Sequence, residues 1–221
     1  MKNISRVTRT KEEAKTSYDM MSKWYDLFTK VAEKKYKSAG LKKLNAQTGE
    51  TVLEIGFGTG ECIISLAESV GISGKVYGID LSAGMLHVAQ KKVSKSAISE
   101  RVELKLGDGA NLPFSNKFFN AVFISFTLEL FDTPEIPLVL DECKRVLKPN
   151  GRICIVSMLK EEHDGLMVKF YEFAHLKFPK YVDCRPIYVQ KNIEDAGFKK
   201  IDNTVMHMFG LPVEIILAQK M

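Results

Sequence analysis

The sequence is poor in cysteine and contains no long hydrophobic run. Its four cysteines, Cys62, Cys143, Cys154 and Cys184, lie far apart and include no C-x-x-C pair, which argues against a disulfide scaffold and against a zinc site. No apolar stretch approaches the ~20 residues of a membrane span, and the N-terminus lacks the hydrophobic core of a signal peptide. We therefore expect a cytoplasmic protein that carries no metal.

Neither sign of charge dominates the chain. The 32 basic and 27 acidic residues leave a net charge of +5, and the basic residues are spread along the sequence. We expect three lysine pairs on solvated helix faces: Lys34 and Lys35, Lys42 and Lys43, Lys91 and Lys92. A nucleic-acid track is the less favoured reading, so no nucleic-acid partner is expected. The length of 221 residues predicts a single globular domain with a substantial core.

One glycine-rich segment stands out. Residues 51–55 (TVLEI) have the apolar composition of a buried parallel strand, and Gly56, Gly58 and Gly60 follow before a helical pattern begins. Glycine lets the backbone approach a ligand without a Cβ in the way. The N–H groups at the start of the helix can also bind an anionic group such as a carboxylate. The segment predicts a nucleotide-type pocket.

The spacing of these glycines does not match a dinucleotide fingerprint. The pattern G-x-G-x-x-G from Gly56 needs a third glycine at position 61, where the chain has Glu61. Glu54 also precedes the first glycine, and its charge would repel a pyrophosphate but attract a ligand with a sulfonium and an ammonium group. An NAD(P)-dependent oxidoreductase is therefore the disfavoured alternative.

Two more acidic residues follow predicted strands. Asp80 lies about 20 residues beyond the glycine loop, where nucleoside-binding α/β units place the carboxylate that accepts the ribose hydroxyls. Asp108 comes after an alternating strand. Each acid could instead have a purely structural role. Asp80 could be the N-cap of the following helix, although Ser82 is better placed for that. Glu54 and Asp108 could be solvated residues at strand ends. Three acids at the carboxyl ends of successive strands favour a shared site.

The remaining pattern predicts an α/β fold. Residues 11–44 read as helical, with an apolar stripe at Tyr18, Met21, Trp24, Tyr25 and Phe28. Strands and helices then alternate, which implies parallel βαβ units with right-handed crossovers. The expected strands are 51–55, 75–80, 101–106, 119–125 and 152–158, and the expected helices are 60–70, 83–95 and 135–147. Residues 198–209 and 213–219 form a hairpin signal around a Gly-Leu-Pro turn.

At this point the chain closely resembles the class I S-adenosylmethionine (SAM)-dependent methyltransferases, and within them the ubiquinone/menaquinone-biosynthesis methyltransferase group. The resemblance covers nearly the whole chain and rests on residues 52–60 (VLEIGFGTG), 78–86 (GIDLSAGML), 107–114 (GDGANLPF) and 145–152 (RVLKPNGR). It implies a Rossmann-like, doubly wound, seven-stranded sheet that is mostly parallel, with an antiparallel C-terminal strand. The single domain would comprise a helical lid (1–45), a SAM-binding core (46–158), an acceptor cap (159–197) and the hairpin (198–221). For residues 11–44, a helix merely packed on the domain is the alternative to a lid.

The resemblance also implies which residues bind SAM. Glu54 and the backbone of the glycine loop would hold the methionine part, Asp80 the ribose, and Asp108 the exocyclic amine of adenine. The remaining contacts implied are Leu81 and Met85 beside the adenine, Gly109 and Ala110 at the ring edge, Ser125 and Phe126 at the methionine end, and Tyr18 and Tyr25 from the lid.

The acceptor is harder to read. Residues 125–131 (SFTLELF) lack the Asn/Asp-Pro-Pro-Tyr/Phe clamp of DNA and protein-amide methyltransferases, which favours a small, largely apolar acceptor. Glu129 is a candidate base or cation-orienting carboxylate. Arg185 and Tyr188, expected to be exposed at a helix start facing the cleft, are candidates for binding an anionic or phenolic group, with capping as the alternative. The histidines His163, His175 and His207 are expected to face solvent or to serve packing.

The expected reaction is direct in-line methyl transfer that yields S-adenosylhomocysteine (SAH). The resemblance suggests C-methylation of a prenylated quinol ring. N- or S-methylation of another metabolite or of a phospholipid headgroup stays open, as does a non-catalytic SAM-binding subunit that activates a partner. The pattern also leaves open a peripheral membrane contact and a monomer or a homodimer.

Overall fold

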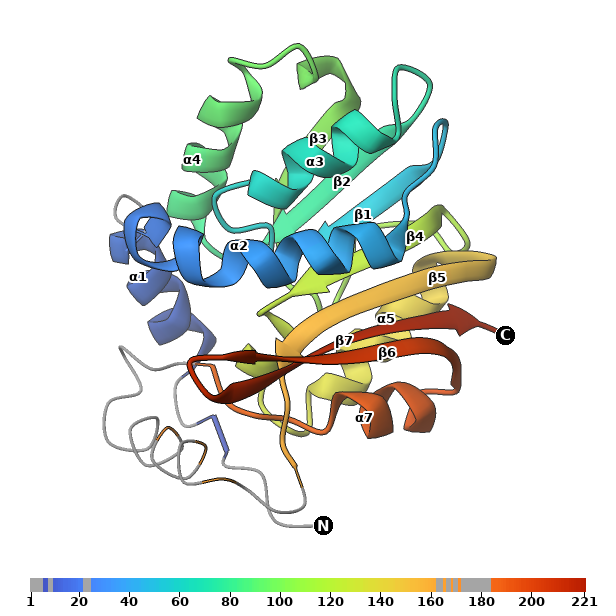
Figure 1. Ribbon diagram of the computed structural model, residues 1–221. Helices are drawn as coiled ribbons and strands as arrows, with labels where there is room; N and C mark the ends of the chain where they lie inside the picture. The colour runs from blue at the N-terminus through green and yellow to red at the C-terminus, as the bar shows by residue number, and fades with distance from the viewer. Residues whose placement is uncertain are drawn as a thin grey trace.

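The computed structural model describes residues 6–7, 10–21, 25–161, 165, 168, 171 and 184–221, with the backbone alone for 20, 21 and 25–31. These residues form a seven-stranded sheet with the strand order β3-β2-β1-β4-β5-β7-β6 (Figure 1). The strands are β1 (Thr51–Ile55), β2 (Lys75–Asp80), β3 (Val102–Leu106), β4 (Phe119–Ser125), β5 (Leu147–Met158), β6 (Phe198–Met208) and β7 (Leu211–Lys220).

The direction of the strands confirms the predicted topology. Strands β1 to β5 pair in parallel, whereas β7 runs antiparallel to both of its neighbours, β5 and β6. The C-terminal strand is thus inserted into an otherwise parallel sheet. The sequence resemblance implied this arrangement, and the Rossmann-like, doubly wound fold is confirmed.

Helices cover both faces of the sheet. The described helices are α1 (Lys11–Met21), α2 (Tyr25–Leu44), α3 (Glu61–Ser69), α4 (Ala83–Val93), α5 (Ile136–Val146) and α7 (Val189–Asp195), with short 3₁₀ turns η1 (Ser99–Arg101) and η2 (Leu128–Leu130). In Figure 1, α2 and α3 lie in front of the sheet and α5 lies behind it. The predicted helical region 11–44 is therefore described as two helices, and Trp24 lies outside the described residues.

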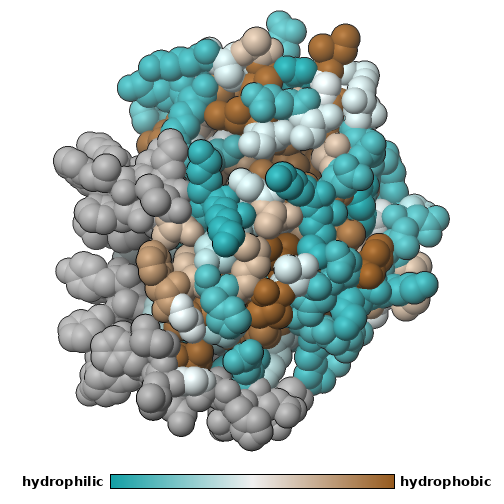
Figure 2. Space-filling view, viewed as in Figure 1, coloured by the Kyte–Doolittle hydropathy of each residue, from teal (hydrophilic) through white to brown (hydrophobic). Residues whose placement is uncertain are grey.

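The alternation of side chains along each strand builds two cores. Val52 and Phe123 pack with residues of α2 and α3 on one face, whereas Leu53 and Val122 pack with residues of α5 and α7 on the other. Both faces of a parallel strand are buried in this way, which explains the nearly continuous apolar runs in the sequence. On the face shown in Figure 2, hydrophilic side chains cover most of the described surface and hydrophobic ones form separate small patches.

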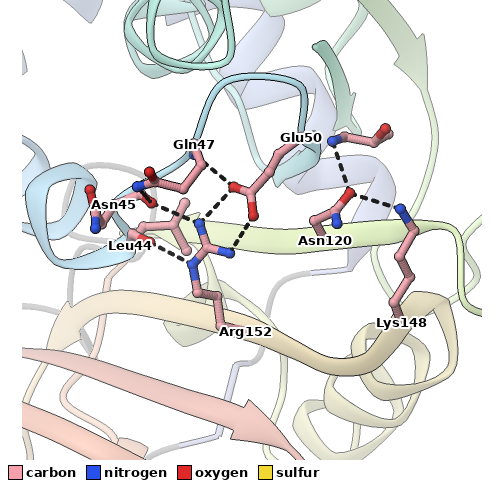
Figure 3. A network of polar contacts seen from close by, with 8 residues as sticks. Leu44, Asn45, Gln47, Glu50, Asn120, Lys148 and Arg152 are labelled. Carbon is pink, nitrogen blue, oxygen red and sulfur yellow. Dashed lines mark hydrogen bonds and ion pairs between the residues drawn. The ribbon is translucent and has the colours of Figure 1, made fainter. Parts of the chain in front are cut away.

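A polar network joins the end of α2 to the sheet where β1 and β4 begin (Figure 3). The Arg152 guanidinium forms a fork with the Glu50 carboxylate at 2.7 Å and donates to the Leu44 and Asn45 carbonyls. Asn120 Oδ1 accepts from Thr51 N and from Lys148 Nζ. Because these residues lie at the amino-terminal ends of β1 and β4, the network leaves the carboxyl edge of the sheet free.

No helix in the described part of the chain has an apolar stretch of the length that a membrane crossing requires. The predicted acceptor cap (159–197) is only partly described. His163 and His175 lie outside the described residues. His207 is exposed on β6, as expected for a solvent-facing histidine.

Candidate functional site

A cleft of about 1250 Å³, its open mouth included, lies at the carboxyl ends of β1, β2, β3 and β4. The predicted cofactor residues that line it are Tyr18, Glu54, Gly56, Gly58, Asp80, Leu81, Met85, Asp108, Gly109, Ser125 and Phe126. Gly60 and Ala110 lie outside this lining, and the Tyr25 side chain lies outside the described residues. The structure therefore brings together, in one cleft, segments that are more than 100 residues apart in the sequence.

The three glycines of the loop have different roles. Gly56 has a φ of +73°, and a Cβ there would lie 2.2 Å from Thr127 Oγ1, so the turn after β4 can approach only a glycine. Gly58 also has a positive φ, but its Cβ would meet nothing within 4 Å, which leaves the backbone open to the cleft. Gly60 is the left-handed N-cap of α3, and its Cβ would lie 3.0 Å from Ala89 Cβ. Gly60 therefore serves the packing of α3 on α4.

The Asp80 carboxylate connects β2 to the glycine loop. Its Oδ2 accepts from Gly58 N at 2.8 Å, and its Oδ1 accepts from Ser82 N at 2.9 Å. Burial raises the pKa of Asp80, against the effect of these hydrogen bonds. Ser82, whose Oγ accepts from Met85 N, is the N-cap of α4, as its position suggested. Each Asp80 oxygen has a further lone pair for a ligand hydroxyl.

Glu54 is a buried carboxyl group with one oxygen unsatisfied. Its side chain is 1% exposed, and Oε2 has no hydrogen-bond partner. Burial raises its pKa to about 8, and the positive charge of Lys37 only partly opposes this shift. A buried acceptor without a partner is costly. A cationic donor that enters the cleft would satisfy it, so the residues present fit the ammonium group of SAM.

Lys37 of α2 lines the same end of the cleft and was not predicted. Its Nζ forms an ion pair with Glu33 Oε2 at 2.7 Å. Little in the sequence indicates this position, because Lys37 is one of several lysines on a helix whose pattern predicts a solvated face. The one local signal is Glu33 four residues earlier, the spacing of an intrahelical ion pair.

The segment before and within α1 closes the other end of the cleft. Asp108 Oδ1 accepts from Ala110 N, and Oδ2 lies 2.5 Å from Lys11 Nζ. Lys11 Nζ also lies 2.6 Å from Glu135 Oε1. Arg6 forms a fork with Asp132, which holds the pKa of that carboxyl down at about 2. We call residues 6–7 and 10–21 the N-terminal strap.

Further strap residues contact the start of α4 or line the cleft. Asp19 Oδ1 accepts from Ser82 Oγ and from Gly84 N at the start of α4. The strap side chains that line the cleft are Val7, Thr10, Lys11, Ala14 and Tyr18. This position brings Lys11 and Val7 to the cleft, which the sequence did not predict, and the lid expected for the N-terminal region stays a prediction.

The cleft wall continues where β4 ends. Phe126 has a φ of +48°, which is uncommon for a bulky residue and concentrates at functional sites. Its ring packs edge-on against Tyr36, and its N–H donates to Val156 O. Thr127, Leu130 and Phe131 continue the lining. This part of the wall is largely apolar.

The structure does not place the three catalytic candidates in that lining. Glu129 is 0% exposed, and its Oε1 accepts from Met158 N at 3.2 Å. Burial raises the pKa of Glu129 to about 7. The expectation that Arg185 is exposed was wrong, because Arg185 is 0% exposed and its Nη2 donates to Phe131 O at 2.6 Å. The Tyr188 hydroxyl is also buried, without a partner, in the residue before α7.

This burial results from a tertiary contact between distant parts of the chain. A parallel bridge between Leu159 and Ile187 brings the chain back against the end of β5, and residues 185–187 are buried there. The sequence showed a proline and a helix start, but it did not show that the chain returns at this point. Burial lowers the pKa of Arg185, although the negative charges of Asp132 and Glu129 oppose that shift.

Comparison with known proteins adds three findings. A family model described as the ubiE/COQ5 methyltransferase family matches residues 2–183. A demethylmenaquinone methyltransferase from Geobacillus stearothermophilus is 35% identical to this chain over 176 residues, which cover 80% of this chain and 73% of that protein. Another from Lactobacillus johnsonii is 29% identical over 229 residues, which cover 89% of this chain and 93% of that protein. The solved structure of a SAM-dependent methyltransferase from Aquifex aeolicus is 27% identical, with a TM-score of 0.63 over 84% of this chain and 89% of that one.

Proposed function

The chain belongs to the ubiE/COQ5 methyltransferase family and is a SAM-dependent methyltransferase, and from this premise we propose that it C-methylates a small, largely apolar acceptor of the quinol type. The observation that carries the proposal is the cleft itself, in which Glu54, Asp80 and Asp108 lie at the ends of β1, β2 and β3 beside the glycine loop. The relatives named demethylmenaquinone methyltransferases support the acceptor class.

We propose the following assignment of the cleft to SAM. Glu54 binds the ammonium group through its unsatisfied oxygen, and the open backbone of Gly58 lies along the methionine part. The Asp80 carboxylate accepts hydrogen bonds from the ribose hydroxyls, and the Asp108 carboxylate accepts one from the exocyclic amine of adenine. Leu81, Met85, Gly109 and Ala110 surround the adenine, Ser125 and Phe126 border the methionine end, Gly56 and Gly60 shape the loop, and Tyr18 and Tyr25 belong to the lid.

When bound, SAM supplies an electrophilic methyl group on its sulfonium. The work left to the protein is to hold the acceptor carbon in line with that methyl group and to exclude water. Phe126, Leu130 and Phe131 provide an apolar wall for the acceptor ring, and the N-terminal strap covers the cleft. Arg185 supports this wall indirectly, because it holds the Phe131 carbonyl.

A phenolic acceptor must lose a proton before its ring carbon becomes a good nucleophile. Because Glu129 is 0% exposed and lies outside the lining, it does not touch the acceptor, so we propose it as a positioning residue behind the wall, with a pKa that burial raises to about 7. Its Oε2 has no partner, and the neighbouring residue Leu130 lines the cleft. Tyr188 and Arg185 are proposed as positioning residues on the same side.

The experiment is a methyl-transfer assay with SAM and reduced, ring-demethylated quinols, read by mass spectrometry. We expect a product heavier by one methylene, about 14 Da, and its loss in Asp80→Ala with the fold intact. A screen of cell extracts under the same conditions covers other acceptors. Methylation of an amine or thiol with none of the quinol would contradict the proposed acceptor, and saturable NADH binding without SAM binding would contradict the proposed cofactor site.

A further inference from the structure

We propose that Lys37 binds the carboxylate of the amino-acid part of the methyl donor, so that Lys37 and Glu54 together recognise a zwitterion. The inference rests on the proposed function, because it assigns a residue to the methionine end of the proposed SAM site. It makes Lys37 a residue that determines which adenosyl compounds bind.

The position of Lys37 distinguishes it from three other lysines of α2. Lys34, Lys35 and Lys42 are exposed, as expected for a solvated helix face. The Lys37 side chain is only 19% exposed and lines the cleft together with Glu54 and Cys62. A lysine that faces a ligand cleft instead of solvent needs acceptors there, because a cation removed from water is costly unless it is paired.

The pairing of Lys37 is incomplete for a group with three donors. Its Nζ pairs with Glu33 Oε2 at 2.7 Å, which leaves donors for further acceptors. Burial disfavours the charge of Lys37, but the nearby carboxylates of Glu33 and Glu54 outweigh it and raise the pKa. Lys37 therefore remains an ammonium group at neutral pH and presents a fixed positive charge to the cleft.

Glu54 provides a carboxyl group that also lines the cleft and that a bound ammonium group would ionise. Glu54 and Lys37 line the same cleft, each affects the pKa of the other, and Glu54 Oε2 has no partner. A ligand with an ammonium group and a carboxylate on one carbon would satisfy both residues at once. A ligand without the carboxylate would satisfy Glu54 and leave Lys37 with Glu33 alone.

The test compares two ligands and two lysines. We expect Lys37→Gln to bind SAH about 10- to 100-fold more weakly, the range of a lost charge-assisted hydrogen bond. Its affinity for methylthioadenosine, the same nucleoside thioether without the amino-acid part, should be unchanged. Lys34→Gln, on the exposed face of the same helix, is the matched control and should change neither affinity. Lys37→Arg should retain most of the SAH affinity.

Undiminished SAH binding by Lys37→Gln would overturn the inference. An equal loss for both ligands would also overturn it, because that result means Lys37 only supports the fold. A measurement on the unmodified protein does not depend on any variant: the decarboxylated analogue of SAH should bind more weakly than SAH, and equal affinities would overturn the inference. If the unmodified protein binds methylthioadenosine but not SAH, the zwitterion inference fails. If it binds neither, the proposed function fails.

Discussion

At the residue scale, the role proposed for Glu54 predicts that ligand binding is coupled to the release of a proton. In the free protein its pKa is raised to about 8, mainly by burial, so the carboxyl is largely protonated at pH 7. A bound ammonium group favours the ionised form and lowers this pKa. Binding of SAH therefore releases a proton, and its affinity should rise with pH between about pH 6 and pH 8, by up to about tenfold per pH unit.

Calorimetric titration of SAH at pH 6, 7 and 8, in two buffers that differ in their heat of ionisation, measures both the affinity and the protons released. Glu54→Gln is the control, since it cannot titrate and should bind weakly with no such dependence. An SAH affinity of the wild-type protein that stays constant from pH 6 to pH 8 would refute this role of Glu54.

We expect alanine substitutions at Gly56 and Gly58 to affect stability and ligand binding differently. Gly56→Ala would place its Cβ 2.2 Å from Thr127 Oγ1 at a positive φ, so we expect a loss of about 2–4 kcal/mol in the free energy of unfolding. Gly58→Ala meets no neighbour within 4 Å, so it should cost only about 1 kcal/mol while it obstructs the ligand. Urea unfolding together with SAH titration separates the two, and equal stabilities of the two variants would contradict the assignment.

The site residues divide by the kind of signal that reveals them. Glu54, Asp80 and Asp108 were predictable, because a strand pattern followed by an acid is local in sequence. The role of Lys37 was not predictable, because the sequence does not distinguish one lysine of the helix from another. Only the packing of α2 on the sheet determines that Lys37 faces the cleft. The exposure of Arg185 was wrongly predicted, because its burial depends on a bridge between Leu159 and Ile187, 28 residues apart.

At the scale of elements, the N-terminal strap is held to the core by polar contacts. Lys11 reaches Asp108 and Glu135, and Arg6 reaches Asp132. The partly exposed ion pairs of Lys11 contribute about 0–1 kcal/mol each. The strap therefore combines several weak anchors, and we propose that it opens to admit the cofactor.

Replacing one anchor should speed this opening. In Lys11→Met we expect SAH to associate and dissociate about 2- to 5-fold faster, in proportion to the loss of the two ion pairs. Higher salt should accelerate wild-type exchange in the same direction, since it screens partly exposed charges. Stopped-flow fluorescence measures both rates, and Lys15→Met on the same helix is the control. If Lys11→Met exchanges SAH at the wild-type rate, the strap does not gate the cleft.

At the scale of the whole molecule, we propose that the contacts that stabilise the fold and those that bind the ligand lie at opposite edges of the sheet. The Arg152 network lies where β1 and β4 begin (Figure 3), whereas the cleft lies at the carboxyl ends of the strands. Replacing Arg152 removes its hydrogen bonds to two backbone carbonyls and its two-bond contact with the Glu50 carboxylate. We expect Arg152→Gln to lower the free energy of unfolding by about 2–3 kcal/mol and to leave the SAH affinity unchanged.

Chemical denaturation and SAH titration of the same preparation test this separation. Lys148→Gln, which loses a single bond to Asn120, is the milder comparison and should cost about 1 kcal/mol. A large drop in SAH affinity in folded Arg152→Gln would mean that the two edges are coupled.

The order of strands and helices was largely predictable from the sequence, since hydrophobic period and turn residues are local properties. Boundaries were less so: the strand predicted at 152–158 begins at Leu147, because pairing with Phe119 extends it past Pro149. The bridge at Ile187 that returns the chain to the sheet has no local pattern in the sequence.

The most direct test of the account is an equilibrium titration of the protein and of Asp80→Ala with SAH and, separately, with NADH. We expect one SAH per chain, no saturable NADH binding, and a loss of SAH binding in Asp80→Ala that melts as a folded protein. Wild-type affinity for SAH in Asp80→Ala, or saturable NADH binding in place of SAH, would contradict the claim that the carboxyl ends of β1, β2 and β3 hold the methyl donor.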